Sequence, residues 1–177
     1  YSELFDISLR GLRNQNELAQ ESSEIADFWN MLQGFQTSGK CIENAHYRIR
    51  YLKSFRPLSS KEAVEFKEAR PILYLNTAAV SSLFGSRTMN ATANRSNWST
   101  VMSYLKSQPS FLGLKQDRFT ILLPNGQPDY TVEFVNGQQV RKVRVNRPKA
   151  LCFDYSQLKD TFGLDLETEV ITDVQEV

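Results

Sequence analysis

Residues 72–123 read ILYLNTAAVSSLFGSRTMNATANRSNWSTVMSYLKSQPSFLGLKQDRFTILL. Apolar runs, capping residues and glycines divide them into alternating elements. The predicted elements are a buried strand at Ile72–Leu75, a helix from Asn76 or Thr77 to Gly85, a polar connection at 86–95, and a second helix from Ser96 or Asn97. A strand that leads into a hairpin then follows. This order of elements predicts a mixed domain of helices and antiparallel strands.

The second helix is the clearest of these elements. Its apolar residues recur at i, i+3, i+4 and i+7, which is typical of a helix face buried in a core; they are Trp98, Val101, Met102 and Leu105. The other face presents Ser99, Thr100, Ser103 and Lys106, with Arg95 at the entry to the helix. We expect Pro109 and Gly113 to stop it.

Strands and tight turns follow the second helix. Asn125-Gly126 predicts a turn, and Asn136-Gly137 is a strong signal for a two-residue hairpin. The expected strands are Arg118–Leu123, Tyr130–Val135 and Val140–Val145, and a short helix is expected at Ser156–Phe162, closing at Gly163. The last hairpin and its basic tip carry Arg141, Lys142, Arg144, Arg147 and Lys149 with no acidic residue in their span, and Leu151, Phe153 and Tyr155 return to the core.

Upstream, a helix beginning near Asn16 is indicated by apolar residues at steps of three and four; they are Leu18, Ile25, Phe28, Trp29, Leu32 and Phe35. Residues 1–15 are open between a strand and the tail of a preceding element. Residues 46–52, HYRIRYL, alternate as a half-buried strand does. Interleaved tyrosines and arginines also suit a nucleic-acid surface, although aromatic residues in the core with solvated arginines explain the pattern better. Residues 61–70 fit either a strand or a short helix, which Pro71 interrupts.

These elements predict an α+β fold: a winged-helix-like domain with an N-terminal helix and antiparallel hairpins. In such folds the second helix of the pair enters the major groove, and the hairpin touches the neighbouring backbone. We divide the chain into an N-terminal helical arm packing on the domain, 1–40, the winged-helix-like domain, 41–163, and an acidic tail, 164–177.

Composition limits the classes of function. The 177 residues are 41% hydrophobic, which is ordinary for a globular protein, and 21 basic against 20 acidic residues leave a net charge of +1. Nucleic-acid binding would therefore depend on local patches. Cys41 and Cys152 have no metal-ligand spacing and are expected as reduced thiols in a cytosolic protein. There is no apolar run long enough for a membrane span and no signal pattern. Tyr1 is not an initiator methionine, which suits a fragment of a longer chain.

Few features point to catalysis. The sequence has no phosphate-binding loop, dinucleotide fingerprint, nucleophile elbow or HExxH motif, and it implies no cofactor and no metal. Asp154, between Phe153 and Tyr155, is the one carboxyl group in an apolar setting, and we expect it to cap the helix that begins near Ser156. Three glycosylation triplets, at Asn90, Asn94 and Asn97, are interpreted as chance products of a turn rich in Asn, Ser and Thr. We therefore predict a protein that is not an enzyme.

A resemblance to a known family rests on four segments. The segments EIADFWNMLQGF, RPILYLNTAAVSSLF, MSYLKSQPSFLGLKQDRFTI and KALCFDYSQL with GLDLET cover residues 24–167 in order. This series resembles the C-terminal region of primase-helicase proteins of bacterial phages and mobile elements. The resemblance implies a non-catalytic appendage that follows a helicase or primase core and helps to hold DNA or partner proteins. The connection 86–95 lacks the basic run expected of the family, and none of the family's active-site residues maps onto this chain.

Two hypotheses follow. The first is an accessory domain of a DNA replication protein, with Arg95, Ser99, Thr100, Ser103 and Lys106 on the recognition helix and Arg141, Arg144, Arg147 and Lys149 on the hairpin. Its partners would be DNA and an upstream helicase or primase core, with no membrane. The second is a protein-interaction or oligomerisation module without nucleic-acid binding, carried by the helix at Leu18–Phe35 and the hairpins.

Overall fold

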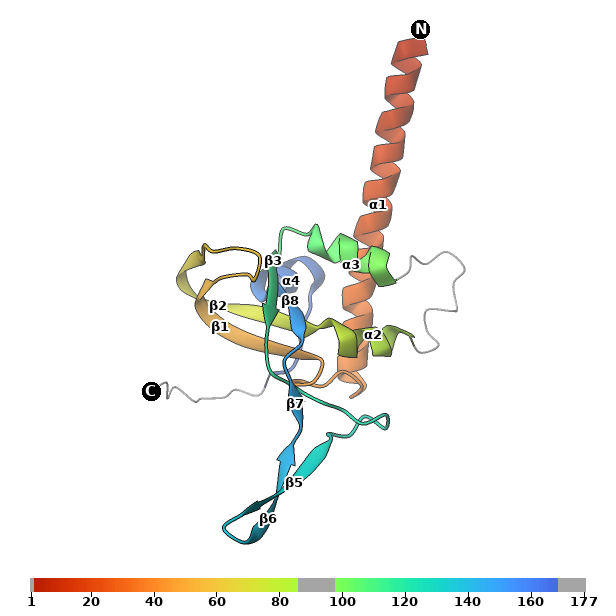
Figure 1. Ribbon diagram of the computed structural model, residues 1–177. Helices are drawn as coiled ribbons and strands as arrows, with labels where there is room; N and C mark the ends of the chain where they lie inside the picture. The colour runs from red at the N-terminus through yellow and green to blue at the C-terminus, as the bar shows by residue number, and fades with distance from the viewer. Residues whose placement is uncertain (1, 86–97, 169–177) are drawn as a thin grey trace.

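The computed structural model describes residues 2–85 and 98–168, with backbone only for residues 2–10 and 12–14 (Figure 1). These residues form an α+β fold. Its helices are α1 (Ser2–Thr37), α2 (Thr77–Gly85), α3 (Trp98–Lys106) and α4 (Tyr155–Phe162). Its strands are β1 (Tyr47–Phe55), β2 (Val64–Asn76), β3 (Phe111–Gln116), β4 (Phe119–Thr120), β5 (Tyr130–Val135), β6 (Gln138–Val143), β7 (Val145–Asn146) and β8 (Lys149–Asp154).

A four-stranded antiparallel sheet in the order β1-β2-β8-β3 forms the body. β2 and β8 are its central strands, and every residue from Ile72 to Asn76 and from Ala150 to Asp154 is buried. Continuous apolar runs suit strands covered on both faces. The predicted buried strand at Ile72–Leu75 and the predicted burial of Leu151 and Phe153 are therefore confirmed.

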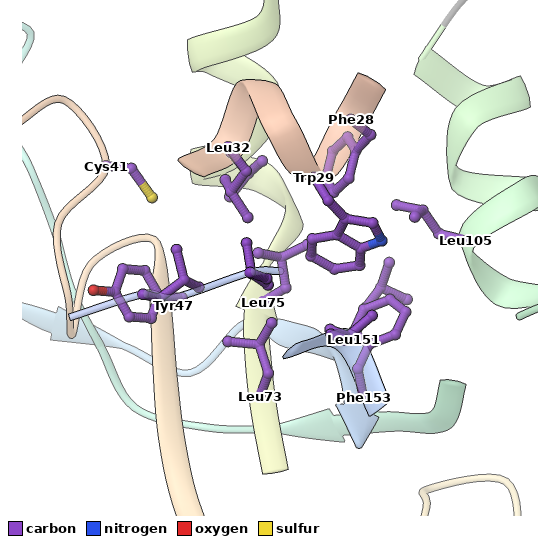
Figure 2. Close-up of a cluster of buried hydrophobic side chains, with 14 of the residues drawn as sticks. Phe28, Trp29, Leu32, Cys41, Tyr47, Leu73, Leu75, Leu105, Leu151 and Phe153 are labelled. Carbon is purple, nitrogen blue, oxygen red and sulfur yellow. The ribbon is translucent and has the colours of Figure 1, made fainter. Parts of the chain in front are cut away.

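The helices cover one face of this sheet. The second half of α1 presents Phe28, Trp29 and Leu32 to the core, where the indole of Trp29 meets the ring of Phe153 edge-on at 5.1 Å (Figure 2). Leu105 of α3 reaches the same cluster. The first half of α1 extends beyond the body (Figure 1). The expected helix from Asn16 is confirmed, and residues 2–15, whose structure the sequence left open, continue it.

A second cluster fills the opposite face, where the sheet curls toward a barrel. Phe55, Tyr74, Phe119 and Cys152 are buried there. The N–H of Leu58, just after β1, donates to the carbonyl oxygen of Leu114 in β3 at 2.9 Å, so the two edges of the sheet approach each other. Gly113 permits this closure because a Cβ on it would lie 2.5 Å from the Cβ of Pro57, and its φ of +136° disfavours a side chain as well.

Several expectations about the strands need correction. The segment 61–70, left open between a strand and a short helix, is a strand from Val64 onward, because β2 runs from Val64 through Pro71. The part of β2 that pairs with β8 is Ile72–Asn76, so the proline lies just outside that ladder, where a strand tolerates it. The expected strand at Arg118–Leu123 is wrong except at Phe119–Thr120. The edge strand is instead Phe111–Gln116. It was not predicted because Gly113, which forms an irregularity in its ladder, was interpreted as a helix stop.

The hairpin and the last helix follow the predicted turn chemistry. Asn136 and Gly137, at φ 51° and 78°, join β5 to β6 as expected. Gly163 ends α4 in the left-handed conformation. Asp154 is the N-cap residue of α4, as predicted, but its side chain makes no capping hydrogen bond. The carboxylate is 2% exposed and accepts a hydrogen bond from Arg70 of β2 at 2.9 Å instead.

Candidate nucleic-acid interface

α3 turns its apolar stripe inward and its polar face outward. Val101 and Leu105 are buried, while Trp98 and Met102 are partly buried against the same core. Ser99, Ser103 and Lys106 are exposed, and Thr100 is half-buried. This is the division of faces predicted from the spacing. Arg95, expected at the entry to the helix, lies outside the described residues.

Lys106 and Lys149, which are far apart in the sequence, line one hollow of about 250 Å³. Lys106 is the last residue of α3, and Lys149 is the first residue of β8, which lies between β2 and β3 in the sheet. Thr77, the first residue of α2, also lines the hollow, together with Trp98, Met102, Leu114 and Leu151. The free N–H groups at the start of a helix and two ammonium groups all favour an anion. The floor is apolar and aromatic.

Arg141 and Arg144 lie elsewhere, on or beside the hairpin of β5 and β6. We call residues 130–143 the arm. In Figure 1 the arm projects from the body at the end opposite α3. The basic residues predicted on the recognition helix and on the hairpin therefore do not form one continuous face. Lys149 lines the same hollow as Lys106 of α3, whereas Arg141 lies on the arm. Arg147 is exposed between β7 and β8.

Arg144, one of the basic residues predicted to bind nucleic acid, is paired with a carboxylate at the base of the arm. The guanidinium of Arg144 forms an ion pair with the carboxylate of Asp129 at 3.0 Å. The backbone reinforces it, since the N–H of Arg144 donates to the carbonyl oxygen of Asp129 and the N–H of Ile121 donates to that of Arg144. These contacts indicate that Arg144 holds the base of the arm to the preceding segment and that its charge is already neutralised by Asp129.

The arginines of β1 are partly exposed, as an outward-facing position implies, but both are also paired with one buried carboxylate, which the sequence did not predict. Arg50 grips Asp117 with two hydrogen bonds, at 2.7 and 2.8 Å, and Arg48 lies 3.5 Å from the same carboxylate. Burial alone would raise the pKa of Asp117, but the hydrogen bonds from Arg50 and from the N–H of Arg118 outweigh burial and lower it. Tyr47 is buried as expected, whereas Tyr51 on the same strand is 72% exposed.

The two cysteines and the histidine are buried. Both cysteines are free and buried, as expected, and burial raises the pKa of Cys41 to about 12, so it stays a thiol. His46, just before β1, is buried: its Nδ1 accepts a hydrogen bond from the N–H of Ile42 at 2.9 Å, and burial lowers its pKa. Cys41, Tyr47 and Glu43 line a second hollow of about 310 Å³, whose wall is closed by a hydrogen bond from the Tyr47 hydroxyl to the carbonyl oxygen of Glu167. Within the described ranges no three His, Cys, Asp or Glu side chains gather as metal ligands.

Two features of the surface were missed from the sequence. Thr77 was assigned only to capping, although it also lines the hollow between the lysines. Tyr130 and Phe134 were placed on a strand, but their exposure, 43% and 72%, was not anticipated. Their period-two spacing with Val132 is also that of a buried face, so spacing alone does not separate a covered hairpin from an open one.

Comparison with protein-family models, with curated proteins and with solved structures finds no match to this chain. None of the helices in the described part of the chain has both the length and the apolar character needed to cross a membrane.

Proposed function

We propose that this chain is a non-catalytic accessory domain of a DNA replication protein of the primase-helicase type, and that it holds nucleic acid through the surface around Lys106 and Lys149. The observation that carries the proposal is the hollow that these two lysines share with the start of α2. The finer description as a winged-helix-like unit belongs to the same proposal. It is supported by the order β2, α2, α3, β3 and a later hairpin, and by the outward polar face of α3.

The charges set the expected strength of binding. A phosphate in the hollow would meet two ammonium groups and the positive end of α2, while Trp98 offers an aromatic edge to a sugar or base. Arg144, Arg48 and Arg50 add little, because carboxylates already pair with them. With few unmatched cations, binding should be weak and depend strongly on salt.

The test is a fluorescence anisotropy titration of labelled duplex and single-stranded DNA at about 50 mM and about 200 mM salt. Lys106→Ala and Lys149→Ala should each weaken binding about threefold to tenfold and reduce the slope of log K against log salt by about 0.7 to 0.9. Lys61→Ala, which alters an exposed lysine between β1 and β2 that is not part of the hollow, is the matched control. No binding at the lower salt, or equal binding by all three variants, would refute the proposal.

A second candidate is a protein-interaction module that does not bind nucleic acid. The arm favours it, because Val132 and Phe134 are 56% and 72% exposed on a hairpin that projects from the body. Large exposed apolar side chains in one place mark interaction sites. An apparent mass in solution that rises with protein concentration and returns to that of one chain in Phe134→Ala would favour this candidate.

A further inference from the structure

We propose that one face of the arm is a stacking platform for unpaired nucleotides. This inference rests on the proposed function and assigns a form of nucleic acid to the arm: single strands, as distinct from the duplex or single-stranded backbone that the lysine hollow can hold. The platform consists of two aromatic rings, a valine between them and a guanidinium, supplied by Tyr130, Phe134, Val132 and Arg141.

The register of the arm places these side chains on one face. Tyr130 pairs with Val143, Val132 with Arg141 and Phe134 with Gln139. Paired residues of antiparallel strands point to the same side, and alternate residues of one strand share a face. We call this set the Tyr130 face. Residues 130–142 are all exposed, so neither the sheet nor the helices cover it in the described chain.

On the opposite face of the arm, the one cation is paired with the one carboxylate. The face carries Thr131, Glu133, Val135, Gln138, Val140 and Lys142. Lys142 lies 3.7 Å from Glu133, and the Thr131 hydroxyl donates to the carbonyl oxygen of Lys142. It has no aromatic ring. This face has the composition of an ordinary solvated hairpin surface.

The Tyr130 face has a cation and no carboxylate. The guanidinium carbon of Arg141 lies 4.8 Å from the centroid of the Tyr130 ring, so the charge sits directly on the aromatic surface. If a second copy packed here face to face, it would bring a second Arg141 and no acid to neutralise either one. The complementary occupant is therefore anionic and offers flat apolar groups, and a single-stranded nucleic acid has both properties along its whole length.

The spacing of the rings suits bases from one strand. Residues four apart on a β-strand are separated by roughly 13 Å, since the rise is about 3.4 Å per residue. Tyr130 and Phe134 would therefore each meet a different base, with the methyl groups of Val132 beneath the nucleotides between them. Aromatic stacking tolerates any base, because every base has a flat face, and Arg141 would contact the backbone. The platform would bind single strands with little sequence preference.

The experiment separates stacking from charge without changing the protein. Anisotropy titrations compare oligothymidine of about 12 nucleotides with an abasic oligonucleotide of equal length and charge. The intact protein should bind the abasic strand roughly 5- to 100-fold more weakly, the loss expected for one stacked base. Equal affinity for both strands would overturn the platform.

Substitutions at Phe134 then locate the stacking. Phe134→Ala and Phe134→Leu should both lose about fivefold or more of the affinity for oligothymidine, whereas Phe134→Trp should retain it, because only an aromatic ring stacks. Val135→Ala, on the opposite face of the same strand, is the matched control. Duplex binding should be unchanged in all four variants.

The outcomes distinguish this inference from the proposed function. Loss in the lysine variants with full retention in Phe134→Ala would overturn the platform and leave the function standing. Retention of affinity for oligothymidine by Phe134→Leu would overturn it as well, since that result would mean that any apolar side chain suffices and that no ring stacks on a base. A protein that binds neither duplex nor single strands at low salt would refute the function itself, and the platform with it.

Discussion

Asp117 is the residue on which most of the internal electrostatics converge. Its side chain is 8% exposed, and its carboxylate accepts hydrogen bonds from the guanidinium groups of Arg50 and Arg48 and from the N–H of Arg118. These contacts join the start of β4 to β1, at the face of the sheet opposite the helices. A charge buried this deeply is tolerated only when its partners remain in place.

Asp117→Asn should therefore lower the free energy of unfolding by about 1 to 3 kcal/mol at pH 7, measured by urea denaturation. The loss is limited because the Arg50 side chain is 40% exposed and can be solvated when its partner is removed. Asp165→Asn, at an exposed carboxylate 3.9 Å from Lys159, should change it by less than about 0.5 kcal/mol.

The same substitution predicts a pH dependence. The pKa of Asp117 is lowered in the folded protein, so its contribution is complete above the unfolded pKa of about 3.9 and is lost as the pH falls through the folded pKa. The difference in stability between the wild type and Asp117→Asn should thus be largest near neutral pH and shrink below about pH 4. A difference that grows on acidification would contradict this account of Asp117.

Among the elements, α1 divides into a packed half and an extended half. Leu32 is fully buried beside Phe28 and Trp29, whereas Leu18, two heptads earlier on the same helix, is 63% exposed. A single helical stripe thus has two environments, because the body covers only the second half of the helix (Figure 1).

Leu32→Ala should lower the free energy of unfolding by about 2 to 5 kcal/mol, since it leaves a cavity in the core. Leu18→Ala, the matched change in the extended half, should alter it by less than about 0.5 kcal/mol. Chemical denaturation of both variants tests the division. A comparable loss at Leu18 would mean that this half of α1 is covered in solution.

Across the whole molecule, stability is expected to be uneven. The paired segments Ile72–Asn76 of β2 and Ala150–Asp154 of β8 are buried, while the arm consists of two strands with no layer over them in the described chain. An isolated two-stranded hairpin is at best marginally stable in water. The arm therefore suits a partner that orders it.

Hydrogen exchange followed by mass spectrometry should show this contrast. Amides of β2 and β8 should exchange slowest, through global unfolding, and amides of β5 and β6 should exchange fastest among the strands of the sheets. Protection of the arm equal to that of β2 without any ligand would contradict the exposed arm and indicate that it is covered in solution.

Single positions show which structural features can be predicted from neighbouring residues in the sequence. Trp98 and Leu105 were predicted as core because a helix repeats its faces every three to four residues, and the turn at Asn136-Gly137 followed from the positive φ angles that it requires. Such features depend on neighbours in the chain. The edge strand at Phe111–Gln116 was missed because Gly113 is required there by the close approach of Pro57, more than fifty residues earlier, which no local pattern reveals.

The sequence by itself determined the helices, most of the strands and the segregation of apolar from polar faces, since backbone periodicity and turn stereochemistry are local properties. Only the tertiary structure decided which charges remain available. It matched Arg50 to Asp117 and Arg144 to Asp129, brought Lys106 beside Lys149, and left Tyr130, Phe134 and Arg141 uncovered. Charge neutralisation and exposure depend on groups distant in the sequence, and packing alone brings those groups together.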